Sequence, residues 1–292
     1  MTMLAQPIGA AVANRIETAL QPRLDRAAQR PLVLGICGAQ GSGKSTVARL
    51  LAERLRAEGR NCAVLSLDDL YLDGARRTAL AASVHPLLRT RGVPGTHDPA
   101  LALAVIAALG RDETVMLPRF DKARDEPGEP EAHAGPAEIV IFEGWCVGAR
   151  PQKPAELIEP VNALERNQDA DGRWRHWVND QLAGPYQPLF TRIDMLALLA
   201  APNFDVVANW RIEQERTAAG PMSHDQIRTF VEYYRRLTEH CLRHGASWAD
   251  LTIRLDAERG QAPFSQGTSG GMVEPSGIEP LTSCMPCRRS PS

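Results

Sequence analysis

A glycine-rich run that ends in a lysine and a serine carries the most specific chemistry in this sequence. Residues 38–45 fit the pattern G-x-x-x-x-G-K-[ST] and directly follow an apolar stretch. In such a loop the backbone N–H groups converge on a phosphate, and the N-terminus of the next helix adds partial positive charge. Lys44 can reach the β- and γ-phosphates, and the Ser45 hydroxyl can ligate Mg²⁺. The sequence therefore predicts a binding site for a nucleoside triphosphate, formed by Gly38, Ala39, Gln40, Gly41, Ser42, Gly43, Lys44, Ser45 and Thr46.

Three carboxylates lie where apolar stretches end. Glu143 ends one such stretch, and Asp68 and Asp69 follow another. Ligands of parallel α/β sheets bind at the C-terminal ends of the strands, so these groups should face the phosphates. We expect Glu143 to hold Mg²⁺ opposite Ser45, although a solvated glutamate is the alternative. We expect Asp68 to orient an acceptor hydroxyl and take its proton, and Asp69 to position a magnesium-bound water, whereas a plain strand-to-loop turn would also explain the pair.

Basic residues follow in two short, turn-rich stretches. Arg89 and Arg91 lie in the first, and Arg119 and Lys122 lie in the second. Arginines in rigid turns suit the bidentate capture of a carboxylate or a phosphate. The alternative is that these side chains are simply solvated.

A further pair of arginines, Arg211 and Arg216, lies on a predicted helix after the fourth strand. A mobile helical lid can supply arginines to a phosphoryl group during transfer. A charged surface helix is the competing interpretation for either residue.

The elements that must position these residues alternate between strand and helix patterns. Apolar runs predict about five strands, at residues 32–37, 62–67, 138–144, 193–199 and 251–255. Apolar residues at helical spacing predict helices at residues 8–28, from the glycine-rich loop to Gly59, at 99–109 and at 223–244. Asp98 is the expected N-cap of the third helix, and residues 122–137 read as a loop. This alternation predicts an α/β fold with a parallel sheet, flanking helices and a helical lid.

Composition narrows the class of protein. The chain has 292 residues and a net charge of −2, so no strong field favours nucleic acid or a membrane as a partner. The sequence shows neither a signal peptide nor a spanning segment, and Cys37, Cys62 and Cys146 suit buried, reduced thiols, which together predict a cytoplasmic location. We expect one domain over residues 1–259, with a helix within residues 1–30 packed on it. Residues 260–292 resemble read-through tails and are expected to be disordered and without function.

Six short motifs together resemble plant-type D-glycerate 3-kinase and its bacterial relatives, which are P-loop kinases of the phosphoribulokinase and uridine kinase group. The motifs are residues 38–45, 66–72, 91–98, 118–122, 142–145 and 210–215. The resemblance implies a P-loop NTPase fold, with Asp68 as the catalytic base and Glu143 as a magnesium ligand. Residues 123–137 do not follow the family pattern, so no role is carried over to them.

The sequence thus predicts an ATP- and Mg²⁺-dependent kinase that phosphorylates a hydroxyl of a small acid, with D-glycerate as the expected acceptor. A uridine-kinase-like nucleoside kinase is the first alternative, and Tyr71 would be its aromatic clamp for the base. A non-catalytic ATP-binding regulator is the second. The residues expected to contact the acceptor are Tyr71, Arg89, Arg91, His97, Asp98, Arg119 and Lys122.

Overall fold

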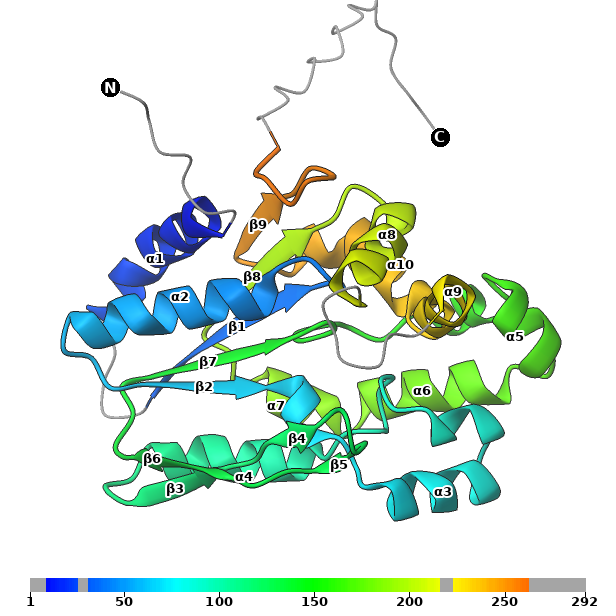
Figure 1. The fold of residues 1–292 in the computed structure, drawn as a ribbon, viewed down its shortest axis with the longest axis horizontal. Helices are drawn as coiled ribbons and strands as arrows, with labels where there is room; N and C mark the ends of the chain where they lie inside the picture. The colour runs from blue at the N-terminus through cyan, green and yellow to red at the C-terminus, as the bar shows by residue number, and fades with distance from the viewer. Residues whose placement is uncertain (1–8, 26–30, 216–222, 263–292) are drawn as a thin grey trace, which may run out of the picture. The chain divides into compact units, whose positions relative to one another are not determined.

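A five-stranded parallel sheet forms the centre of the computed structural model, which describes residues 9–25, 31–215 and 223–262. The strands run in the order β2-β7-β1-β8-β9 (Figure 1). Their bounds are β1 (Leu32–Gly38), β2 (Cys62–Ser66), β7 (Ile139–Gly144), β8 (Met195–Ala200) and β9 (Leu251–Arg254). The five strands expected from the apolar runs are therefore confirmed, each within two residues of its predicted start.

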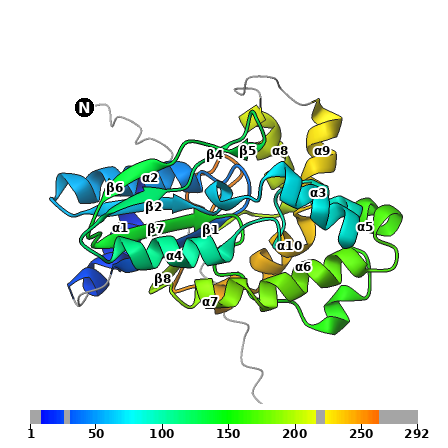
Figure 2. The ribbon, with the colours of Figure 1, turned by 90° about the horizontal axis from the view of Figure 1, so that it is seen from below.

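Helices cover both faces of this sheet, because the strands carry apolar side chains on both sides. In β1, Leu32, Leu34 and Ile36 face one cluster while Val33 and Cys37 face another. The first cluster also contains α1 (Ala10–Leu24) and α2 (Lys44–Ala57), and the second contains α4 (Pro99–Leu109), α7 (Tyr186–Phe190) and α10 (Arg235–His244). Figure 1 shows α1 and α2 above the sheet and α4 below it, and in Figure 2, seen from below, α4 and α7 lie in front of the sheet. The two helical layers hold the parallel strands so that their C-terminal ends lie at one edge of the sheet.

The remaining elements surround the ends of the strands. They are α3 (Gly74–Ser83), α5 (Ala163–Gln168), α6 (Arg173–Ala183), α8 (Phe204–Glu215), α9 (His224–Glu232), and 3₁₀ turns at Leu67–Leu70, Pro86–Arg89, Pro154–Leu157 and Gly245–Ser247. The sequence did not predict α3, α5, α6 or α7. Among the described residues no helix is long and apolar enough to cross a membrane.

Two sequence-based expectations about local structure were wrong. Part of the predicted loop 122–137 forms antiparallel pairs, in which β3 (Thr114–Leu117) pairs with β6 (Glu131–Ala134), and β4 (Phe120–Asp121) pairs with β5 (Glu126–Pro127). These strands pair outside the central sheet, and β5 and β6 lack the apolar alternation that would have indicated them.

The helix predicted over residues 223–244 is also interrupted. It divides into α9 and α10, since Tyr233 and Tyr234 bond to carbonyls three residues back rather than four. The Tyr234 ring is buried against Trp145 with 4.9 Å between ring centroids. The interruption therefore turns an aromatic side chain into the core next to the strand ends.

Several expectations about ends and caps were tested directly. Asp98 caps α4 by accepting from Leu101 N, and Ser223 forms a capping box with Gln226 at the start of α9. Residues 260–262, assigned to the tail, pair back on the last strand through the Leu255–Gln261 bridge. The described residues up to Ala262 belong to one compact unit, and the expectation of a disordered tail falls on residues 263–292, outside the described residues.

Candidate functional site

The glycine-rich loop joins β1 directly to α2, which begins at Lys44. Its N-cap residue is Gly43, which has a left-handed φ of 83° and no side chain to cap the helix. The first N–H groups of a helix have no intrahelical partner, so they remain available to an anion. The Ser42 hydroxyl is buried without a hydrogen-bond partner among the described residues. This geometry is that of an anion site built to receive phosphate groups.

The outer side of the loop is held by α8 and by the segment after β9. Gly41 has a φ of 75°, and a Cβ there would lie 2.6 Å from Cβ of Trp210. Arg259 donates to the Gly41 carbonyl at 2.6 Å and forms an ion pair with Glu213 at 2.7 Å. Its guanidinium also lies over the Trp210 ring. Arg259 therefore ties the loop to α8.

We expect Gly41→Ala to lower the melting temperature more than Gly43→Ala. Both residues are left-handed, so alanine costs about 1–2 kcal/mol at either position from the backbone alone. At Gly43 a Cβ meets nothing within 4 Å, whereas at Gly41 it collides with the backbone and side chain of Trp210. Thermal unfolding of the nucleotide-free variants measures the difference. Equal melting temperatures would contradict the close packing of α8 on the loop.

An oxygen-rich cluster lies beside the loop at the end of β7. Ser45 Oγ donates to Glu143 Oε1 at 2.8 Å, and Ser66 Oγ donates to the same oxygen at 3.0 Å. Glu143 is 4% exposed, and its Oε2 is buried with no hydrogen-bond partner in the described part of the chain. Parallel pairing aligns Ser66 with Glu143, which explains their contact. Hard oxygen donors with one unsatisfied carboxylate oxygen fit a Mg²⁺ ion.

Asp68 lies in the 3₁₀ turn after β2, where it pairs with Lys122 and is influenced by the charge of Lys44. Its Oδ2 is 2.6 Å from Lys122 Nζ, and its Oδ1 accepts from the Tyr71 hydroxyl at 2.9 Å. Burial alone would raise the pKa of Asp68, but the charges of Lys122 and Lys44 and these hydrogen bonds outweigh it and hold the pKa well below its ordinary value. The carboxylate is therefore ionised and can accept a hydrogen bond from a hydroxyl.

Asp69 is held by residues at the start of β4. Its carboxylate accepts from Arg119 Nη1 at 3.2 Å and from Phe120 N at 3.1 Å. Burial raises the pKa of Asp69, and Arg119 opposes the shift. The structure thus joins Asp69 to β4, and among the described residues no hydrogen bond links it to Ser45 or Glu143, so its role at a magnesium-bound water stays a prediction. Arg119 also pairs with Glu131 at 2.7 Å, so the charge of Arg119 is neutralised by two carboxylates of the protein itself.

Tyr71 and His97 form a buried aromatic support behind Asp68. Their rings stack with 4.5 Å between centroids, and His97 Nδ1 lies 2.6 Å from the Tyr186 hydroxyl. Burial lowers the pKa of His97 to about 3, so its ring is neutral near pH 7. Phe120 contacts the Tyr71 ring edge-on. The tyrosine predicted to contact the acceptor is thus enclosed, and only its hydroxyl reaches the carboxylate.

Arg91 lies near this support, whereas Arg89 does not join it. Arg91 pairs with Asp125 and lies over the Tyr71 and Phe120 rings at 5.9 and 5.5 Å. Asp125 also binds the buried Arg77 at 2.7 Å. Arg89 is exposed at the end of a 3₁₀ turn, and its carbonyl accepts from Arg77.

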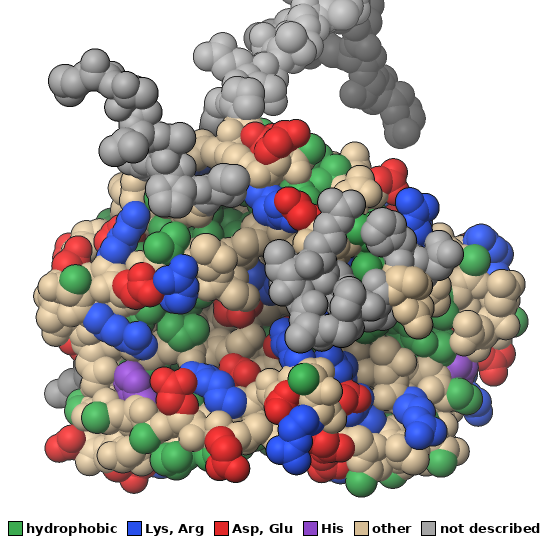
Figure 3. Space-filling model, viewed as in Figure 1, with side chains coloured by type: hydrophobic (Ala, Val, Ile, Leu, Met, Phe, Trp, Pro, Cys, Tyr) green, Lys and Arg blue, Asp and Glu red, His purple; other side chains and the backbone are tan. Residues whose placement is uncertain are grey.

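The predicted lid arginines have different outcomes. Arg211 is on α8, where its guanidinium lies 5.8 Å from the centre of the Phe230 ring on α9. The two helices pack through Phe204, Ile227 and Val231. Arg216 lies outside the described residues. Figure 3, viewed as in Figure 1, shows acidic and basic side chains around a hollow near the centre of that face.

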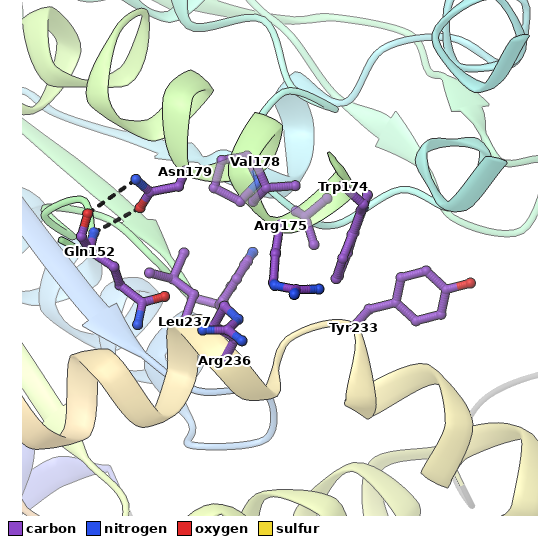
Figure 4. Close-up of a pocket in the computed structure, with 11 residues that line it drawn as sticks. Gln152, Trp174, Arg175, Val178, Asn179, Tyr233, Arg236 and Leu237 are labelled. Atoms are coloured by element: carbon purple, nitrogen blue, oxygen red, sulfur yellow. Dashed lines mark hydrogen bonds between the residues drawn. The ribbon is translucent and has the colours of Figure 1, made fainter. Parts of the chain in front are cut away.

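A small apolar pocket lies between α6 and the junction of α9 with α10 (Figure 4). Two buried arginines line it, but both are neutralised: Arg175 pairs with Asp169 at 2.9 Å, and Arg236 pairs with Glu165 at 2.6 Å. Gln152 and Asn179 bond to each other across its wall. The lining of the pocket therefore has no unpaired cation for an acidic ligand. The Gln152–Asn179 hydrogen bonds join the segment after β7 to α6.

The sequence reasoning missed three residues that shape the site. Ser66 could have been found, because it lies two residues before Asp68 at a predicted strand end. Asp125 lies in the segment read as a loop, and no pattern linked it to Arg91. Arg259 marks the predicted domain boundary, where nothing suggested a contact with residues 41 and 210.

Comparison with known proteins gives relatives that are kinases. An uncharacterized kinase, mug58, from Schizosaccharomyces pombe is 37% identical over 221 residues, which cover 70% of this chain and 79% of that protein. The chloroplastic D-glycerate 3-kinase of Arabidopsis thaliana is 27% identical over 78% of this chain, but the match spans only 53% of the plant protein. The uridine kinase of Leuconostoc citreum is 26% identical over 55% of this chain and 80% of its own length.

A solved structure and a family match complete the comparison. The D-glycerate 3-kinase from Cryptococcus neoformans superposes with a TM-score of 0.71 at 27% identity, over 87% of this chain and 99% of that one. Residues 7–71 match the family described as methylmalonyl Co-A mutase-associated GTPase MeaB. That match covers the glycine-rich loop and its neighbouring elements, less than half of the chain.

Proposed function

Because this chain belongs to the P-loop kinases of the group that includes D-glycerate 3-kinase and uridine kinase, we propose that it transfers the γ-phosphoryl group of ATP to a hydroxyl of a small acid. D-glycerate is the acceptor we expect. The observation that carries the proposal is the carboxylate of Asp68, which lies beside the glycine-rich loop between Lys122 and Tyr71. A kinase for hydroxyl acceptors needs such a base, and a non-catalytic nucleotide-binding regulator does not.

In this mechanism the chain supplies position and charge. The N-terminus of α2 and Lys44 bind the β- and γ-phosphates. Asp68 orients the acceptor hydroxyl and accepts its proton as the phosphoryl group moves. The Lys122 side chain is 60% exposed, so it can turn from Asp68 toward the carboxylate of an acidic acceptor. Arg91, whose guanidinium lies over the Tyr71 ring, is the second cation for the acceptor and would exchange its contact with Asp125, which Arg77 also binds. Arg211 and Arg216 are candidates for the phosphates.

Magnesium belongs to the same proposal. Ser45 and Glu143 are the residues we expect to hold it, directly or through water, because Glu143 Oε2 is a buried, unsatisfied acceptor among the described residues. When bound, Mg²⁺ neutralises charge on the β- and γ-phosphate oxygens. Ser66 orients Glu143 by donating to Oε1. Asp69 is left out of this set and is assigned to positioning β4 and, with it, Lys122.

An acidic acceptor fits the surroundings of Asp68 better than a nucleoside. A nucleoside kinase needs an exposed aromatic face for the base, but Tyr71 is 8% exposed and one face of its ring is stacked on His97. Lys122 contacts the Asp68 carboxylate and Arg91 lies over the neighbouring Tyr71 ring, and such cations can bind the carboxylate of glycerate. The relatives named D-glycerate 3-kinase support the same choice.

A screen of acceptors tests this function. We expect Mg²⁺-dependent ADP formation with D-glycerate and little with uridine, cytidine, pantothenate or ribulose 5-phosphate. Arg91→Ala should raise KM for glycerate with kcat nearly unchanged, because the lost contact binds ground state and transition state equally. Arg111→Ala, which removes an exposed arginine paired with Glu113 away from the predicted site residues, is the matched control. Robust turnover of uridine without turnover of glycerate would contradict the proposal and show that the protein is a nucleoside kinase.

A further inference from the structure

A histidine-rich cluster lies on α10, outside the residues assigned to phosphoryl transfer. His240 and His244 are four residues apart, so their side chains share one face of the helix. Glu156, from the 3₁₀ turn Pro154–Leu157, reaches the same place. One ligand atom from each of the three residues lies within 4.8 Å of the others.

His240 presents a lone pair to this cluster. Its Nε2 lies 3.1 Å from the carbonyl oxygen of Arg150, and a carbonyl can only accept, so Nε2 carries the proton. The neutral ring therefore has its lone pair on Nδ1. That atom is buried without a hydrogen-bond partner in the described part of the chain, and His240 as a whole is 5% exposed.

The atom that faces this lone pair is a carboxylate oxygen. Glu156 Oε1 lies 3.9 Å from His240 Nδ1. The other oxygen of Glu156 accepts from the backbone N of Lys153 at 2.8 Å, which orients the side chain. A glutamate carboxylate is ionised near pH 7. Two electron-rich atoms that face each other without a proton between them leave a place for a cation.

The geometry points to a binding site for a divalent transition metal, with Zn²⁺ as the expected ion, held by His240 Nδ1, Glu156 Oε1 and His244. Two histidines and a carboxylate suit Zn²⁺ better than Mg²⁺ or Ca²⁺, which prefer oxygen ligands. The Arg150 carbonyl supplies the outer hydrogen bond that fixes the tautomer of a ligating histidine. Water would take the fourth position, because His244 is not buried.

Binding there would join two segments that are distant in sequence. The metal would cross-link the turn at residues 154–157 to the C-terminal end of α10, next to the Arg236–Glu165 ion pair that links the same regions. Arg243 and Lys153 are the nearby cations, and their charges would repel the bound metal ion. We infer that the cross-link stabilises the fold and that its occupancy depends on the metal concentration.

Metal titration of the full chain tests this site. The titrations use Zn²⁺ followed by calorimetry, and Co²⁺ followed by its visible absorption, with Mg²⁺ in excess to occupy the oxygen-rich site. The background carries Cys284→Ser and Cys287→Ser, because these residues have the spacing of zinc ligands. We expect one Zn²⁺ per chain, a melting temperature that rises with Zn²⁺, and a Co²⁺ spectrum typical of nitrogen and oxygen ligands.

Two surface-side variants decide the outcome without disturbing the core. His244→Gln and Glu156→Gln should each lower Zn²⁺ affinity at least tenfold and abolish the rise in melting temperature. His176→Gln, an exposed histidine on α6, is the control and should leave both unchanged. Absence of stoichiometric binding, or binding that survives both substitutions, would overturn the proposal. None of these measurements depends on kinase activity, so they fail or succeed independently of the proposed reaction.

Discussion

Lys44→Ala is expected to reduce phosphoryl transfer by about 10²–10³ while the melting temperature of the nucleotide-free protein stays almost unchanged. Lys44 is the first residue of α2 and follows Gly43, whose backbone has a left-handed conformation. Its charge reaches the place where phosphoryl transfer is proposed, since it is one of the two lysines that lower the pKa of Asp68. No ion pair joins it to another side chain within residues 9–25, 31–215 and 223–262. Its loss should therefore cost catalysis rather than stability.

Arg49→Ala is the matched control for Lys44. It removes one positive charge from the same helix, but its side chain is 63% exposed and, within the described part of the chain, pairs only with Glu53 four residues on. A steady-state assay with Mg·ATP, combined with thermal unfolding of the nucleotide-free proteins, separates the two variants. A large loss of stability in Lys44→Ala with ATP binding intact would show that the lysine serves the fold.

The sequence allowed the nucleotide end of the site to be predicted because its parts are local. The glycine-rich loop lies between a strand and a helix that both have regular apolar patterns. Glu143 and Asp68 could be assigned because each follows a strand, and parallel strands bring their C-terminal ends to one edge. The same patterns predicted the five strands.

The acceptor end could not be predicted in the same way, because it depends on pairs of residues far apart in the chain. Lys122 meets Asp68 across 54 residues, and Arg119 meets Asp69 across 50. Both contacts depend on β4, a two-residue strand with no periodic signal. The partner of Arg91, Asp125, lies in the segment that was read as a loop. The sequence could identify the basic residues but not decide which charges the protein itself neutralises.

The pairing of Asp69 with Arg119 within the protein changes the expected effect of substituting Asp69. Its carboxylate binds Arg119 and the backbone of Phe120, so Asp69→Asn should disturb β4 and the placement of Lys122. A raised magnesium requirement, which the sequence predicted for this change, is now expected for Glu143→Gln instead, because Glu143 contacts the Ser45 hydroxyl.

Asp68→Asn is expected to lower the rate of phosphoryl transfer by about 10²–10⁴ with ATP affinity preserved. Asparagine is nearly isosteric and can still accept from Tyr71, so the turn after β2 should keep its conformation. What it lacks is the negative charge that can take the proton of the acceptor hydroxyl. Single-turnover rates, measured with saturating Mg·ATP and glycerate, report the loss.

The pH dependence of the same reaction distinguishes a base from a structural carboxylate. Because Lys122 and Lys44 keep the pKa of Asp68 low against the effect of burial, the native enzyme should show no acid limb from this group near neutral pH. Lys122→Met removes one of these influences, so the pKa should rise and activity should begin to fall at a higher pH on acidification. Lys122→Arg, which keeps the charge, should restore the native profile. Full activity of Asp68→Asn, or an unchanged acid limb in Lys122→Met, would contradict the role of Asp68 as the group that accepts the proton.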